Sequence, residues 1–296
     1  MVGPCPLFIS SHGTLRQVDP RYAQLTDVRL HYVEEGDGPL VVLLHGFPDF
    51  WYTWRRQIPA LAQAGFRIVA PDMRGFNLSD KPSGNANYSL DRLATDIVEL
   101  IEDRGAERAA VVGHDWGGLV AWATAAWHPD LVDRLVILNA PHPDDYGRGL
   151  RHRRQLVKSW YTAFFQIPGA TALLKRNDFQ ILRRALRASS TEGAFSDEDL
   201  ERYVAAWSEP RSIESQLAYY RAAARRVLGR SETLPTVAAP VLILWGERDR
   251  ALDQLFATPP AHLAVDVTAR MFPDATHWVH LDDPEGVNRA LLDFLA

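Results

Sequence analysis

The stretch from residue 109 to residue 127 constrains the fold more than any other part of the chain. It begins with the apolar run Ala-Ala-Val-Val, which is typical of a short buried strand, and ends in a segment rich in helix-forming residues. Between them, Asp115 stands two residues after Gly113 and two before Gly117. This spacing predicts a strand, a sharp turn and a helix, with a carboxylate at the apex and small neighbours where the backbone comes close. An ordinary strand-to-helix loop, in which the Asp caps the helix, is the alternative.

The length and composition suit one globular α/β domain that carries an insertion. The 296 residues are 47% hydrophobic and 23% charged, and the net charge of −5 argues against a nucleic-acid partner. With Cys5 as its one cysteine, the chain can form no intramolecular disulfide and no CxxC metal site. The first residues lack the features of a signal peptide, and no apolar run approaches the roughly 18 residues of a membrane span. We therefore expect a cytoplasmic protein with no membrane span.

Strands and helices alternate along most of the chain, which predicts a parallel, doubly wound sheet. Continuous apolar runs indicate strands in the middle of the sheet, and a run with alternating polarity indicates a half-buried one. Strands are expected at 26–34, 39–44, 66–72, 109–112, 135–140 and 240–246, and helices at 51–64, 89–103 and 284–295.

This alternation stops between about residues 143 and 235, where the sequence is mainly helical. We interpret the block as a cap inserted after the sixth core strand, which gives a core domain of residues 1–142 and 236–296 and a helical cap of residues 143–235. The cap opens with a basic run that we interpret as a solvated helix face. The run consists of Arg148, Arg151, His152, Arg153, Arg154 and Lys158.

If Asp115 is a nucleophile, its chemistry needs a histidine and a second acid to orient that histidine. Asp249 lies just beyond the carboxyl end of a predicted strand, where open parallel sheets present their sites, and Glu247 is the local alternative. His277 follows a short predicted strand and precedes the last amphipathic helix, and His280 is its alternative.

A backbone N–H that could stabilise an oxyanion is expected after the strand at 39–44. This strand is followed by His45-Gly46-Phe47-Pro48. A glycine at this point lets the backbone approach a ligand, so that the N–H of Phe47 could point at a developing oxyanion. A plain turn between strand and helix is the alternative.

Taken together, the motifs at 45–48 and 113–118 with Asp249 and His277 resemble the epoxide hydrolases of the α/β-hydrolase superfamily. The resemblance covers nearly the whole chain from about residue 26. It implies an α/β-hydrolase fold, a mostly parallel sheet flanked by helices, in which nucleophile, acid and histidine follow in that order. It also implies a covalent ester on Asp115, an oxyanion hole made by the backbone N–H groups of Phe47 and Trp116, and release of a vicinal diol by water.

The cap carries two segments that resemble the tyrosine motifs of epoxide hydrolases. Tyr161 precedes a Phe-Gln-x-Pro segment, and Tyr220 precedes an Arg and fits better than Tyr219. The resemblance implies that both hydroxyls bind the epoxide oxygen, whereas a packing role is the alternative. Trp116 and Phe165 are further candidates for substrate binding, and the aromatic cap favours a lipophilic or aromatic epoxide.

The expected partners are a small epoxide and water, with a homodimer left open; no cofactor and no metal is implied. A haloalkane dehalogenase is the first alternative, although many of these have Asn where this chain has Phe47. Fluoroacetate dehalogenases typically have Arg in place of Trp116, but epoxide hydrolases and haloalkane dehalogenases share the Trp. The second alternative is a non-catalytic relative that binds a small molecule, although such proteins usually lack part of the triad.

Overall fold

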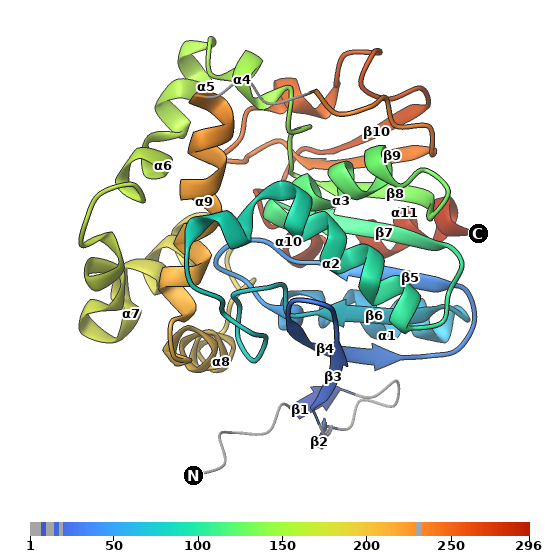
Figure 1. Ribbon diagram of the computed structural model, residues 1–296, viewed down its shortest axis with the longest axis horizontal. Coiled ribbons are helices and arrows are strands. Elements are labelled where there is room, and N and C mark those ends of the chain that lie inside the picture. Colours follow the sequence, from blue (N-terminus) through green and yellow to red (C-terminus); the bar gives the residue numbers. More distant parts are fainter. Residues whose placement is uncertain (1–6, 10–14, 18–19, 229–232) are drawn as a thin grey trace.

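The centre of the computed structural model is an eight-stranded sheet (Figure 1). The structure describes residues 7–9, 15–17, 20–228 and 233–296, so Cys5 and the rest of the first six residues lie outside the described part. The strands lie in the order β10-β9-β8-β7-β5-β6-β4-β3, and neighbours are parallel except that β4 runs antiparallel to β3 and β6. Their bounds are β3 Arg21–Gln24, β4 Arg29–Glu35, β5 Leu40–Leu44, β6 Arg67–Pro71, β7 Ala109–His114, β8 Val132–Leu138, β9 Val241–Gly246 and β10 Val267–Phe272; β1 Leu7–Ile9 and β2 Leu15–Gln17 form a separate antiparallel pair.

Apolar patterning explains why these segments form the core. Every residue of β5 and β7 is buried, as expected for strands with neighbours on both sides. Helix α3 (Trp116–Trp127) is apolar on nearly all sides and is buried along most of its length, whereas α2 (Leu90–Asp103) buries one stripe and exposes the other. The mostly parallel sheet flanked by helices that the sequence predicts is therefore confirmed.

Helices cover both faces of the sheet. Helices α2 and α3 pack together in front in the view of Figure 1, whereas α1 (Gln57–Gln63) and α11 (Pro284–Leu295) contact each other behind it. The expected helix at 51–64 is divided into a 3₁₀ turn at Trp51–Trp54 and α1. Two more 3₁₀ turns span Asn85–Tyr88 and Gln254–Ala257, and the short helix α10 spans Val279–Asp282.

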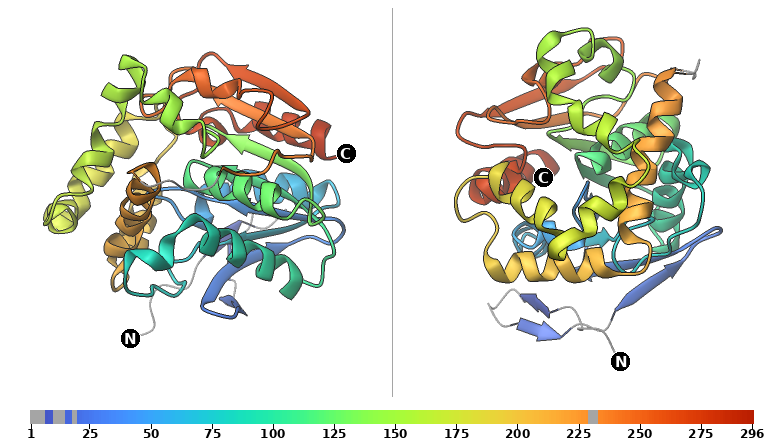
Figure 2. Two further views of the ribbon diagram at one scale, coloured as in Figure 1. Left: turned by 45° about the horizontal axis from the view of Figure 1, so that its top comes forward. Right: turned by 90° about the vertical axis from the view of Figure 1, so that its left-hand side faces the viewer.

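Six helices stand between β8, the sixth strand of the large sheet in chain order, and β9. They are α4 Tyr146–Gly149, α5 Arg153–Lys158, α6 Trp160–Phe164, α7 Ala170–Ala188, α8 Asp197–Ser208 and α9 Ser212–Leu228. Figure 1 and Figure 2 show them beside one end of the strands. Within the described residues of this block no strand forms, and residues 176–179 interrupt the helical backbone of α7.

Hydrogen bonds from buried aromatic side chains join these helices to the loops that follow β5 and β6. From α8, the indole of Trp207 donates to the carbonyl of Pro48 at 2.7 Å and the hydroxyl of Tyr203 donates to Asp49. From α9, the hydroxyl of Tyr219 donates to the carbonyl of Arg74 at 2.7 Å. In the described part of the chain no helix is long and apolar enough to cross a membrane.

Candidate active site

Asp115 occupies a strained turn between β7 and α3. Its φ of 51° and ψ of −118° lie in a region that non-glycine residues rarely adopt, so the surrounding contacts must hold it there. Those contacts need two glycines. A Cβ on Gly46 would lie 2.4 Å from the Cβ of Asp115, and a Cβ on Gly117 would lie 2.2 Å from the carbonyl oxygen of Leu44. The turn expected from the spacing of residues 113–118 is thus built as a sharp apex that carries a carboxylate.

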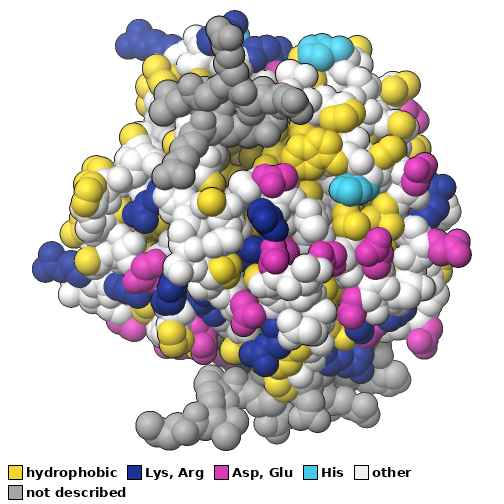
Figure 3. Space-filling model, viewed as in Figure 1, with side chains coloured by type: hydrophobic (Ala, Val, Ile, Leu, Met, Phe, Trp, Pro, Cys, Tyr) yellow, Lys and Arg dark blue, Asp and Glu magenta, His cyan; other side chains and the backbone are white. Residues whose placement is uncertain are grey.

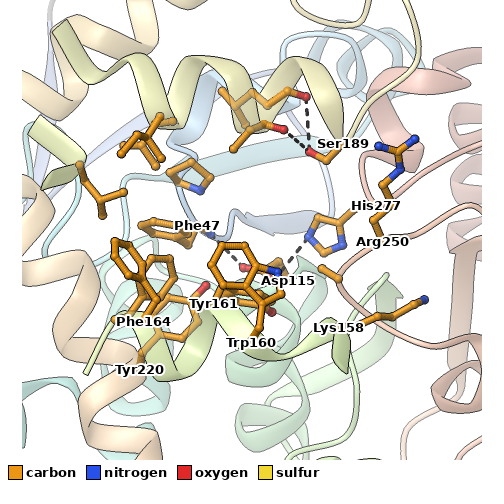
Figure 4. A pocket seen from close by; sticks show the side chains of 18 of the residues that line it. Phe47, Asp115, Lys158, Trp160, Tyr161, Phe164, Ser189, Tyr220, Arg250 and His277 are labelled. Atoms are coloured by element: carbon orange, nitrogen blue, oxygen red, sulfur yellow. Dashed lines mark hydrogen bonds and ion pairs between the residues drawn. The ribbon is translucent and has the colours of Figure 1, made fainter. Parts of the chain in front are cut away.

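The carboxylate of Asp115 lies between a backbone donor and an imidazole (Figure 4). The N–H of Phe47 donates to its Oδ1 at 2.9 Å, and Nε2 of His277 lies 3.6 Å from its Oδ2. Trp116 begins α3, where backbone N–H groups lack helical partners, but within the described contacts its N–H makes no hydrogen bond to this carboxylate. The sequence predicts an oxyanion hole made by the N–H groups of Phe47 and Trp116. In the structure, the N–H of Phe47 contacts the carboxylate of Asp115.

Asp249 orients His277 from the loop after β9. Its Oδ2 accepts from Nδ1 of His277 at 2.8 Å, and its Oδ1 accepts from the backbone N–H groups of Ala251 at 2.6 Å and Leu252 at 2.9 Å. Because a carboxylate can only accept, Nδ1 carries a proton and Nε2 is the atom that faces Asp115. Glu247, the alternative acid, is exposed to solvent.

The three groups shift one another's pKa values. Burial alone would lower the pKa of His277, but the charges of Asp249 and Asp115 and the hydrogen bond to Asp249 raise it to about 10. Burial opposes ionisation of Asp115 and Asp249, yet their interactions with His277 outweigh it and hold both pKa values below their ordinary range. At neutral pH the site therefore holds an imidazolium between two carboxylates.

Tyr161 and Tyr220 face the same cavity from α6 and α9. Their rings lie 6.0 Å apart, nearly perpendicular, and in Figure 4 they lie on the side of Asp115 away from His277. Burial, with the neighbouring negative charge of Asp115, raises the pKa of each phenol well above 10, so both remain protonated and able to donate. Tyr219, the alternative to Tyr220, is engaged with the carbonyl of Arg74 and packs against Trp116.

The cavity in front of Asp115 has a volume of about 270 Å³ and a mainly apolar wall. Phe165 belongs to this wall, whereas Trp116 packs edge-on against Tyr220 at 5.0 Å. Nineteen residues line the cavity: Phe47, Pro48, Asp115, Lys158, Trp160, Tyr161, Phe164, Phe165, Leu174, Ile181, Leu182, Ala185, Leu186, Ser189, Tyr220, Arg250, Ala251, His277 and Trp278.

Sequence reasoning missed two residues that support the site. The amide of Asn139, at the end of β8, donates to Asp249 at 2.8 Å and accepts from the backbone of Gly246 at 2.9 Å. The ammonium of Lys158 donates to the carbonyl of Asp249 at 2.7 Å. The position of Asn139 at the carboxyl end of a predicted strand was an available signal, whereas Lys158 was hidden within the basic run.

His280, the alternative to His277, lies outside the cavity wall in a buried cluster with Asp49 and His114. In the described part of the chain this is the one group with donor atoms close enough for a metal ion. Each ring has one bonded nitrogen, since Nε2 of His280 is bonded to Thr53 at 2.7 Å and Nε2 of His114 to the carbonyl of His277 at 2.9 Å, while Nδ1 of both rings and Oδ2 of Asp49 have no hydrogen-bond partner among the described residues. Burial lowers the pKa of His114 to about 3, so the ring is neutral and donates to that carbonyl. The cluster therefore holds the backbone of His277 in place.

Comparison with known proteins agrees with the fold. A family model described as alpha/beta hydrolase fold matches residues 39–284. An "AB hydrolase superfamily protein YfhM" of Bacillus subtilis is 38% identical over 93% of this chain and 97% of its own length. "Epoxide hydrolase 1" of Caenorhabditis elegans is 39% identical over 94% of this chain and 70% of its own length. The crystal structure of an epoxide hydrolase of Bacillus megaterium in complex with an inhibitor is 32% identical, with a TM-score of 0.87 over 93% of this chain and 99% of that one.

Proposed function

This chain belongs to the epoxide hydrolases of the α/β-hydrolase fold family, and on that premise we propose that it converts an epoxide to a vicinal diol through a covalent ester on Asp115. The observation that carries the proposal is the position of one buried carboxylate. Asp115 lies between the N–H of Phe47 and the imidazole of His277, in an apolar cavity that two protonated phenols also line.

In the first step, a carboxylate oxygen of Asp115 attacks a ring carbon of the epoxide. The carbon–oxygen bond of the ring breaks, and negative charge develops on the leaving oxygen. Tyr161 and Tyr220 donate hydrogen bonds to that oxygen, and one of them supplies the proton that makes it a hydroxyl. Solvent then returns a proton to the phenolate.

In the second step, water hydrolyses the ester. Esterification removes the charge of Asp115, which is one of the two charges that raise the pKa of His277, so the imidazolium becomes more acidic and can lose its proton. Neutral His277, oriented by Asp249, then accepts a proton from water as the water oxygen attacks the carboxyl carbon. The backbone N–H groups of Phe47 and Trp116 stabilise the oxyanion until the ester bond breaks, and the departing diol oxygen takes a proton from His277. The carboxylic acid left on Asp115 then gives its proton to His277, which restores the carboxylate and the imidazolium.

The apolar wall of the cavity supports a lipophilic or aromatic epoxide as the substrate, with Phe165 and Trp116 among the groups that hold it. We divide the roles between two parts of the chain. A core of residues 1–142 and 236–296 supplies the nucleophile and the hydrolytic pair, and a cap of residues 143–235 supplies the phenols.

Product analysis tests the reaction. The purified protein is incubated with styrene oxide and trans-stilbene oxide, and separately with 1-bromobutane. We expect diol and no bromide. Bromide without diol would keep Asp115 as the nucleophile but make the protein a dehalogenase.

Oxygen labelling tests the ester. Because water attacks the carboxyl carbon, a single turnover in H₂¹⁸O should leave ¹⁸O in Asp115 and unlabelled oxygen in the diol. Label in the diol after one turnover would mean that water attacks the epoxide directly, and the covalent mechanism would be wrong.

A further inference from the structure

Helix α5 packs with a polar residue inward. Gln155 is fully buried, and its amide donates to Ser159 at 2.8 Å and to the carbonyl of Ala251 at 3.1 Å. Its amide oxygen accepts from the backbone of Asp253 at 2.8 Å. These bonds fix α5 to the loop after β9 and determine which of its faces points to solvent.

Large apolar side chains of α5 and of the start of α6 point to solvent. Leu156, Val157 and Trp160 are 58%, 65% and 69% exposed. A helix that serves only to cover a core places such residues inward and a glutamine outward, so the pattern here is the reverse of the usual one. Six of the nine large exposed hydrophobic side chains in the described part of the chain lie between residues 156 and 181. This concentration indicates a surface that meets an apolar partner.

The stretch of chain around α5 is also strongly basic. Residues 146–177 contain seven Lys and Arg and no Asp or Glu; because the whole chain carries −5 and this segment +7, the rest carries −12. Arg151, Arg153 and Arg154 are exposed, and within the described residues they have no acidic partner. Figure 3 shows Lys and Arg side chains gathered at the top of the molecule, over the positions of α4 and α5.

The surface borders the mouth of the cavity. Trp160, Arg250 and Ile181 are exposed and also line the cavity wall. A partner bound to residues 151–160, which we call the 151–160 rim, would therefore lie beside the entrance to the proposed active site.

We propose that the 151–160 rim docks the protein on an anionic lipid surface. Arginines bind lipid headgroups, Trp occupies the interface, and exposed aliphatic side chains enter the acyl boundary. A second copy of the chain would bring the same basic patch against itself, and nucleic acid would use the arginines but leave Leu156 and Val157 in water. The arginines of the basic run are exposed, as the sequence predicts, and docking through them would place the entrance where a lipophilic epoxide concentrates.

Vesicle sedimentation tests the proposal with the full-length protein. We expect it to pellet with vesicles of phosphatidylglycerol and phosphatidylcholine, but not with phosphatidylcholine alone, and to be released by salt. Replacing Arg151, Arg153 and Arg154 by Gln should lower binding at least about tenfold, because each basic residue near such a surface contributes roughly fivefold. Leu156→Ser with Val157→Ser should also weaken binding. Vesicle binding needs no turnover, so the result is independent of the proposed reaction.

A matched triple variant provides the control. Arg56, Arg270 and Arg289 are exposed and lie outside the cap, and replacing them by Gln gives the same net charge while leaving the rim intact. Equal loss of binding in both triple variants, or no pelleting of the wild type, would overturn the proposal. So would a dimer that Leu156→Ser/Val157→Ser dissociates without vesicle binding, or binding of duplex DNA in place of vesicles. Circular dichroism reports that each variant is folded, whether or not the protein hydrolyses an epoxide.

Discussion

Nε2 of His277 lies 3.6 Å from Oδ2 of Asp115, while Nδ1 of the same ring is bonded to Asp249 at 2.8 Å. The ring is thus held firmly on one side and faces the proposed nucleophile with its other nitrogen. Because the carboxylate is already ionised, it needs no base in order to attack carbon. In the proposed reaction, the base is needed only when water attacks the ester.

Replacement of His277 by Gln should therefore separate the two steps. We expect the variant to react once with styrene oxide and to retain the ester, because Gln cannot accept a proton from water. Mass spectrometry of the intact protein should show an added mass of one substrate, located on the peptide that contains Asp115. Normal turnover by this variant would contradict the role of His277.

Loss of both cavity phenols should impair the first step instead. Tyr161→Phe with Tyr220→Phe removes the donors to the leaving oxygen but keeps the rings, so we expect the rate of ester formation to fall roughly 10²- to 10⁴-fold. Rapid-quench measurement of the ester provides the rate. Tyr219→Phe is the matched control, because that hydroxyl is bonded to Arg74 outside the cavity and its loss should leave ester formation near the wild-type rate.

Asp249→Asn should slow ester hydrolysis by roughly 10²- to 10⁴-fold, because the amide neither stabilises the imidazolium nor fixes the proton on Nδ1. Pre-steady-state kinetics should show accumulation of the ester. Glu247→Gln, two residues earlier and exposed, should hydrolyse the ester as the wild type does. An effect of equal size in the two variants would contradict the assignment of Asp249 as the acid that orients His277.

Stability should depend on pH through the same groups. Because the pKa of His277 is raised from 6.5 to about 10 in the folded protein, its contribution is complete below pH 6.5 and is lost as pH rises toward 10. The pKa values of Asp115 and Asp249 are lowered, so their contribution is present above the ordinary carboxyl range and is lost as pH falls through the folded values. Tm measured between pH 6.5 and 10 should decline less in His277→Gln than in the wild type, whereas His262→Gln, at an exposed position, should follow the wild type.

Local sequence was sufficient for features that depend on short spacings. The apex at Asp115 follows from glycines two residues away, and the core strands follow from apolar runs such as Leu40–Leu44. The break in the expected helix after Trp54 was not predicted, because apolar periodicity continues across it.

Contacts between distant segments could not be inferred in the same way. Asn139 reaches Asp249 across 110 positions, which requires β8 and β9 to be neighbours in the sheet. The choice between Tyr219 and Tyr220 depends on which face of α9 meets the cavity; two adjacent tyrosines do not reveal that face, so the preference for Tyr220 rests on the resemblance to a family motif. The outward orientation of Leu156 and Val157 could not be predicted for a related reason, since only the inward bonds of Gln155 show which face of the helix meets the core.

The separation of the phenols from the nucleophile has an evolutionary consequence. Tyr161 and Tyr220 belong to the block between β8 and β9, whereas Asp115, Asp249 and His277 belong to the strands and loops of the sheet. Substitutions in that block can alter which leaving group is accepted, while the residues proposed to form and cleave the ester are not affected. New substrate ranges could thus arise by divergence of one contiguous stretch of the gene, while Asp115, Asp249 and His277 stay unchanged.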